Sequence, residues 1–139
     1  MDRRELFESA VKAAQGLDLC ITSELVDHKH FGNRITELED KLVRFRVILD
    51  RDDVLRDIGS RTDNEWYPLS TVIAFLGGEH DADEATFRAA FPRLRELFTR
   101  GVYDARKEDL AAFSRERSHT LMEQLMRETQ AGKDESSVN

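Results

Sequence analysis

The sequence contains a single cysteine, Cys20, and no long hydrophobic run. One cysteine excludes an internal disulfide framework and a CxxC metal site. A membrane-spanning helix needs about 20 consecutive apolar residues, and no segment approaches that length. The first residues lead directly into an amphipathic pattern, without the apolar region of a secretory signal peptide. We therefore expect a soluble, cytoplasmic protein.

The chain also has no excess of positive charge. Its 28 acidic residues outnumber 21 basic ones, which gives a net charge of −7 at pH 7. A charge of this sign argues against general binding to nucleic acid or to anionic lipid. Charged residues make up 35% of the sequence and hydrophobic residues 40%. This balance is typical of a domain with long, charged helices.

Motifs of several enzyme classes are absent. The sequence has no GxxxxGK[ST] or GxGxxG phosphate-binding loop and no GxSxG nucleophile motif. Cys20 falls in a predicted strand, where a small buried hydrophobic residue is the simplest interpretation. We therefore expect no catalytic residues and no cofactor.

The pattern that remains predicts an α+β fold. Residues 5–16 show the apolar spacing of a helix and end at a glycine. β-branched residues and alternation then predict an antiparallel sheet of three or four strands. The predicted strands are residues 19–26, 35–40, 42–49 and 54–58. Separation of strands from helices indicates the α+β class, with one sheet face packed against the first helix, the helix after the sheet, or both.

Three or four C-terminal helices are predicted after the sheet. Helical spacing begins at Trp66, and Gly77-Gly78 end the first of these helices. Asp81 is expected to cap the next helix, with Glu84 completing a capping box. Pro92 lies inside the apolar pattern of that helix, so we expect a kink there or a division into two helices.

The last helix is predicted to begin near Asp104 and to reach about Gln130. Leu110 and Phe113 would contact the core. A second apolar group would either fold back onto the preceding helix or contact a partner, including a second copy of the chain. This group consists of Leu121, Met122, Leu125 and Met126. We expect a single domain over residues 1–131 and a disordered polar tail over residues 132–139.

Acidic residues are densest just before Trp66. Residues 50–65 carry six acids and three arginines, a net charge of −3. Such a patch would steer a basic partner, and simple solubility is the alternative interpretation. We expect Trp66 to brace the core, whereas Tyr67 could anchor a partner. The predicted partner-binding residues are Asp50, Asp52, Asp53, Asp57, Asp63, Glu65 and Tyr67.

Two histidines, His28 and His30, have a spacing that a metal site can use. In a strand, alternate residues face the same way, so both imidazoles could reach one ion. A zinc site still needs at least one more ligand. We interpret the pair as part of a solvated turn and assign no metal. The alternative is a metal-dependent enzyme that uses His28, His30 and nearby acids.

Three segments resemble a pattern found in small uncharacterised bacterial proteins. The segments are His30-Phe31-Gly32-Asn33, Arg44-Phe45-Arg46-Val47-Ile48-Leu49-Asp50-Arg51-Asp52 and Trp66-Tyr67-Pro68-Leu69. Several proteins with this pattern are similar to immunity proteins of polymorphic toxin systems. The resemblance covers about residues 28–70, and Asp52 stands where the pattern has glycine.

That resemblance implies a non-enzymatic binder of one cognate protein, with no catalytic residue to carry over. We therefore expect a protein-binding protein, in its most concrete form an immunity-type inhibitor that occludes a basic toxin. Its acids would take the place of phosphates at the basic cleft of the toxin. The alternatives are the metal-dependent enzyme and a homodimeric structural or regulatory protein.

Overall fold

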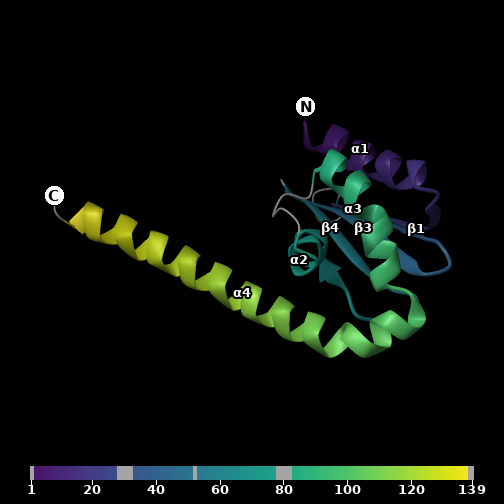
Figure 1. The fold of residues 1–139 in the computed structure, drawn as a ribbon. Helices are drawn as coiled ribbons and strands as arrows, with labels where there is room; N and C mark the ends of the chain where they lie inside the picture. Colours follow the sequence, from purple (N-terminus) through teal and green to yellow (C-terminus); the bar gives the residue numbers. More distant parts are fainter. Residues whose placement is uncertain (1, 28–32, 52, 78–82, 138–139) are drawn as a thin grey trace.

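The computed structural model describes residues 2–27, 33–51, 53–77 and 83–137, with side chains described as far as Gln130. The chain forms a helix, a five-stranded antiparallel sheet and three further helices (Figure 1). The predicted α+β class is therefore confirmed. The elements are α1 (Arg3–Gly16), β1 (Cys20–Asp27), β2 (Asn33–Glu39), β3 (Val43–Asp50), β4 (Asp53–Ser60), β5 (Tyr67–Pro68), α2 (Leu69–Phe75), α3 (Glu84–Leu97) and α4 (Arg100–Ser137).

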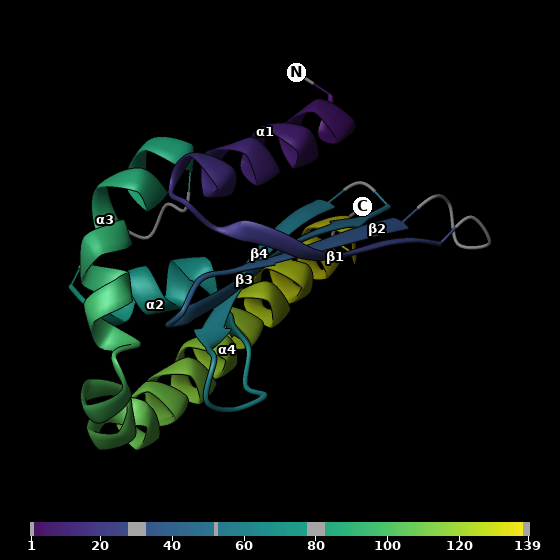
Figure 2. The same ribbon diagram turned by 90° about the vertical axis from the view of Figure 1, so that its right-hand side faces the viewer.

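The first helix, α1, covers one face of the sheet. Its N-terminus is capped by Asp2, whose carboxylate accepts a hydrogen bond from the N–H of Glu5 at 2.8 Å. Phe7, Ala10 and Ala14 are buried on the side that faces the sheet. The two alanines allow the helix to approach β3 and β4 closely, and Figure 2 shows α1 lying across the strands.

Alternation along β3 separates the two faces of the sheet. Val43, Phe45 and Val47 are buried in the core, while Arg44 and Arg46 between them face the other side. The strands lie in chain order, and each is antiparallel to the next. Because successive side chains of a strand point to opposite faces, this register gives the sheet one core face and one open face.

The helices after the sheet complete the core. The ring of Phe87 in α3 stacks on that of Phe45 with centroids 4.8 Å apart, and α2 contributes Leu69 and Val72. The sequence placed the start of a helix at Trp66, but Tyr67–Pro68 forms β5 and α2 begins at Leu69. Pro68 has an extended backbone, with ψ at 135°, and therefore ends the strand instead of beginning the helix.

One prediction for α3 needs correction, and a second is decided in part. The cap is Asp83, whose carboxylate accepts from the N–H of Thr86 at 2.8 Å, whereas Asp81 lies outside the described residues. Pro92 lies inside α3, which continues past it as one helix, so the division into two helices does not occur and the kink stays a prediction. A proline removes one helical hydrogen bond, but Phe91 and Leu94 beside it are buried in the core and hold this part of the helix in place.

The last helix, α4, is the longest element, with 38 residues. At 1.5 Å per residue it measures about 57 Å. It begins at Arg100 instead of near Asp104 and continues to Ser137. Tyr103 and Leu110 of this helix are buried in the hydrophobic core formed with the sheet and the other helices. Beyond this contact the helix projects away from the rest of the molecule (Figure 1).

Candidate protein-binding surface

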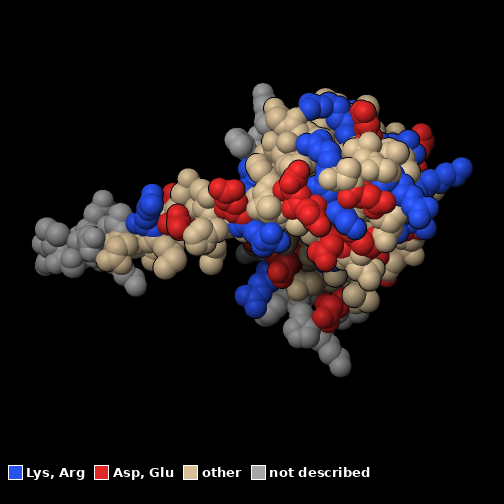
Figure 3. Space-filling model, turned by 60° about the horizontal axis from the view of Figure 1, so that its bottom comes forward, with Lys and Arg blue, Asp and Glu red and all other residues tan. Residues whose placement is uncertain are grey.

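The predicted acidic residues lie at two ends of β4 instead of in one patch. Asp50 and Asp53 flank the β3–β4 turn, where Asp50 accepts from Asn33 Nδ2 at 3.2 Å and Asp53 pairs with Arg3 at 3.4 Å. Asp63 and Glu65 follow the other end of this eight-residue strand, about 20 Å away at 3.3 Å per residue. Asp52 lies outside the described residues. Figure 3 shows acidic and basic side chains interspersed on this view of the molecule.

Asp57 lies between these two groups, on the open face of the sheet. Its carboxylate accepts a hydrogen bond from Arg46 Nε at 2.9 Å, and both side chains are largely buried. Arg46 and Arg44 also stand opposite Glu37 and Glu39 on β2. The negative charge of Asp57 is therefore already balanced within the sheet.

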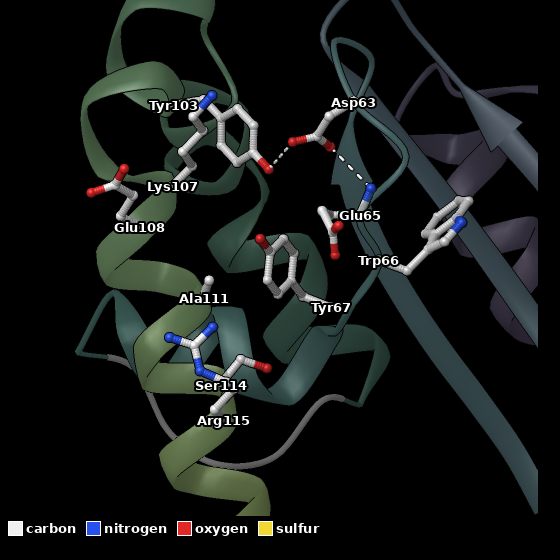
Figure 4. Close-up of a pocket in the computed structure, with 10 residues that line it drawn as sticks. All are labelled: Asp63, Glu65, Trp66, Tyr67, Tyr103, Lys107, Glu108, Ala111, Ser114 and Arg115. Carbon is white, nitrogen blue, oxygen red and sulfur yellow. Dashed lines mark hydrogen bonds between the residues drawn. The ribbon is translucent and has the colours of Figure 1, made fainter.

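Asp63, Glu65 and Tyr67 come together in a hollow between the β4–β5 connection and α4 (Figure 4). The hollow has a volume of about 390 Å³. The small side chains of Ala111 and Ser114 leave this side of α4 open. The other lining residues are Trp66, Tyr103, Lys107, Glu108 and Arg115. The α4 residues that line this hollow could not be predicted from local sequence, because they depend on how α4 packs against the rest of the chain.

A chain of hydrogen bonds lies at the inner end of the hollow. The Tyr103 hydroxyl donates to Asp63 Oδ2 at 2.6 Å, and the N–H of Glu65 donates to Asp63 Oδ1 at 3.1 Å (Figure 4). Burial, followed by the hydrogen bond to Asp63 and the neighbouring Tyr67, raises the pKa of Tyr103 far above its usual value, because a phenolate would be poorly solvated and would face a carboxylate. Tyr67 is itself buried, which leaves little of its ring for the partner contact that the sequence predicted.

Charges of both signs line the outer part of the same hollow. Among the described residues, the side chains of Lys107 and Arg115 form no ion pair. Glu65 and Glu108 are also at the rim, and Figure 4 shows Arg115 directed along α4 toward Ala111. Two unpaired cations thus remain available on this side of α4.

Trp66 lies outside the core, contrary to the sequence prediction. Its half-buried ring contacts the guanidinium groups of Arg44 and Arg46, whose carbons lie 4.3 and 4.4 Å from the ring centroid. Tyr67, the next residue, occupies the core instead. Since adjacent residues of an extended chain point to opposite faces, only one of this pair can be buried.

The open face of the sheet carries an aliphatic row across four strands. Leu25 pairs with Ile35, Ile35 with Ile48, and Ile48 with Leu55. Paired residues share a face, so these four side chains form one continuous strip. Leu25 and Leu55 at its ends are 59% and 47% exposed. This row cannot be recognised from the sequence alone, because it depends on the register of all four strands.

A second group of exposed apolar side chains lies on the projecting part of α4. Its members are between 49% and 69% exposed. They are Leu121, Met122, Leu125 and Met126. The alternative in which this group folds back onto α3 is therefore wrong, whereas the core contacts predicted for Leu110 and Phe113 are present.

The remaining candidate residues are those considered for a metal or a nucleophile site. Among the described residues, no three His, Cys, Asp or Glu side chains are placed to hold a metal ion. His28 and His30 lie outside the described residues. Cys20 is exposed on the edge strand β1, where the sequence predicted burial. No helix in the described ranges is long and apolar enough to cross a membrane.

Comparisons with protein-family models, with curated proteins and with solved structures found no match to this chain.

Proposed function

We propose that this protein acts without catalysis, by binding another protein on the open face of its sheet. The observation that carries the proposal is the aliphatic row formed by Leu25, Ile35, Ile48 and Leu55. An apolar strip across an uncovered sheet face is costly to leave in water, and continuous exposed apolar surface is typical of interaction sites.

The surroundings of the row resemble the rim of a protein interface. Next to it, Glu37, Arg46 and Asp57 form a second row in which charges alternate across three strands. Beyond them lies Trp66, an aromatic residue of the type that often anchors interfaces. A partner that covers the row would therefore meet an apolar centre with a polar, aromatic margin.

More specifically, we propose that the protein is an immunity-type inhibitor of a basic toxin. The net charge of −7 favours a basic partner. The acids that flank the sheet at its two ends, Asp50 and Asp53 at one and Asp63 and Glu65 at the other, would extend the contact beyond the row. The resemblance of residues 28–70 to immunity proteins supports the same form.

The test is a titration of the full chain with the purified product of each neighbouring gene. One product should bind, with an affinity that falls as salt is raised. Leu25→Thr combined with Leu55→Thr should weaken that binding about tenfold or more, because each buried leucine is worth at least about 1.5 kcal/mol. Threonine is suited to strands, so the sheet should be retained.

Val26→Thr is the matched control. Val26 follows Leu25 on the same edge strand, is 42% exposed, and points to the opposite face. Its substitution should leave the affinity unchanged. The proposal fails if no product binds, or if the double variant binds as tightly as the wild type while retaining its circular dichroism spectrum.

A further inference from the structure

We infer that the projecting part of α4 pairs with the same segment of a second copy of this chain, with the two helices antiparallel. This contact uses a surface separate from the open face of the sheet. The segment reads Leu-Met-Glu-Gln-Leu-Met over residues 121–126, and its four apolar side chains are exposed.

The spacing of this segment matches a helix-pairing seam. Ser118, Met122, Leu125 and Thr129 follow one another at intervals of four, three and four residues, which places them on one stripe of α4. Leu121 and Met126 flank the stripe. Ser118 and Thr129 are exposed as well, so the whole stripe is accessible.

The apolar pattern is complementary to itself when two copies run in opposite directions. A two-fold axis between Glu123 and Gln124 places Leu121-Met122 of one copy against Leu125-Met126 of the other. Met122 then faces Leu125, and Ser118 faces Thr129. One self-complementary patch of this kind forms a closed dimer.

Charge favours the antiparallel arrangement over the parallel one. The stripe extended one turn toward the body includes Arg115, three residues before Ser118. In-register parallel helices would place two Arg115 side chains against each other in the seam. Antiparallel helices instead bring the C-terminal end of the second α4, at residues 132–137, beside Arg115 and the turns before it.

The two unpaired cations of the hollow lie where that helix end arrives. The C-terminal end of a helix carries a partial negative charge from its free carbonyl groups. Lys107 and Arg115 line the hollow on this side of α4 and have no ion-pair partner in the described chain. Their charge therefore complements the end of the second helix.

The first test measures the mass of the full chain by sedimentation over a concentration series. The wild type should change from monomer to dimer as its concentration rises. Leu121→Gln combined with Leu125→Gln should remain monomeric, since glutamine preserves the helix and removes the apolar contact. Val102→Gln is the control, because Val102 is an exposed apolar residue of α4 outside the segment, and it should still form dimers.

The second test determines the direction of pairing by disulfide formation. Cys20 is first replaced by serine, and Ser118→Cys and Thr129→Cys are made in separate chains. Antiparallel pairing should give a mixed disulfide when the two variants are combined and no disulfide within either variant alone. Cross-linking of Ser118→Cys to itself would overturn the antiparallel arrangement, as would absence of the mixed disulfide.

The inference also fails if the wild type stays monomeric at every concentration, or if the double glutamine variant forms dimers like the wild type. Loss of dimers with retained binding of a partner at the sheet face would leave the proposed function intact. Loss of partner binding in the Leu25 and Leu55 variant with retained dimers would support the two surfaces as separate.

Discussion

At the scale of single residues, Asp40 connects the β-sheet to α3. One carboxylate oxygen accepts hydrogen bonds from the N–H groups of Leu42 and Val43, both at 2.8 Å. The other accepts from Arg95 Nε at 2.7 Å. The sequence predicted a turn near Asp40, because Asp often closes turns with its side chain. It gave no indication of Arg95, which lies 55 residues away in sequence.

These contacts predict that Asp40 stabilises the fold in a pH-dependent way. Burial alone would raise the pKa of Asp40, but hydrogen bonds from Arg95, Leu42 and Val43 outweigh burial and hold it below its usual value. The stabilisation is therefore present above the unfolded-state pKa and is lost as the pH falls through the folded-state pKa. Asp40→Asn should lower the free energy of unfolding by about 1–3 kcal/mol at neutral pH, and by less in acid.

Urea unfolding of both proteins between neutral and acidic pH measures this difference. Asp50→Asn is the control, since Asp50 is exposed and, within the described part of the chain, accepts a single side-chain hydrogen bond, from Asn33. It should change the free energy of unfolding by about 0.5 kcal/mol or less. An Asp40→Asn deficit that stays constant at all pH values would show that the ionised carboxylate is not responsible.

At the scale of elements, the local alternation of apolar and polar residues was enough to predict the first four strands. The first four strands were found within one or two residues of their ends, because alternation of Val43, Phe45 and Val47 has a period that only a strand fits. The short β5 was missed because it has two residues and exists only by pairing with β4. The hollow at Asp63 and Glu65 was missed for a similar reason, since its other wall comes from α4.

The connection between β4 and β5 depends on the absence of a side chain at Gly59. A Cβ atom at this position would overlap the main-chain oxygen of Glu65, which also accepts a hydrogen bond from Arg44. Gly59→Ala should therefore displace the connection and lower the free energy of unfolding by about 1–3 kcal/mol. Chemical denaturation measures the loss, and the fluorescence of Trp66 reports displacement of the connection.

Gly16→Ala is a matched control for that prediction. Gly16 ends α1, and a Cβ there would meet no atom within 4 Å. The same substitution should be neutral or stabilising by up to about 1 kcal/mol, because alanine restricts the unfolded chain and favours helix. If Gly59→Ala and Gly16→Ala behaved alike, close packing at Gly59 would not be important.

At the scale of the whole molecule, the chain consists of a packed body and a helix that extends beyond it. The body contains every side chain of the hydrophobic core, the last of them Leu110. The sequence indicated two apolar groups on α4 because the apolar positions thin out between Phe113 and Leu121. Whether the second group folds back depends on the direction of α4, and that is set by its contacts with α2 and α3.

This division predicts that the body folds without the projecting helix. A chain that ends at Ser118 keeps Tyr103 and Leu110, which are buried. It also keeps Phe113, whose ring contacts that of Phe75 with the two centroids 5.5 Å apart. It loses residues whose described side chains are exposed. The shortened chain should therefore unfold within about 0.5 kcal/mol of the full chain.

The comparison needs dilute protein, at concentrations where the full chain sediments as a monomer. Dimer formation would otherwise add stability to the full chain by mass action. At high concentration only the full chain should gain stability, and the difference should grow as the protein concentration rises. A large deficit of the shortened chain at high dilution would mean instead that residues 119–137 pack on the body of their own chain.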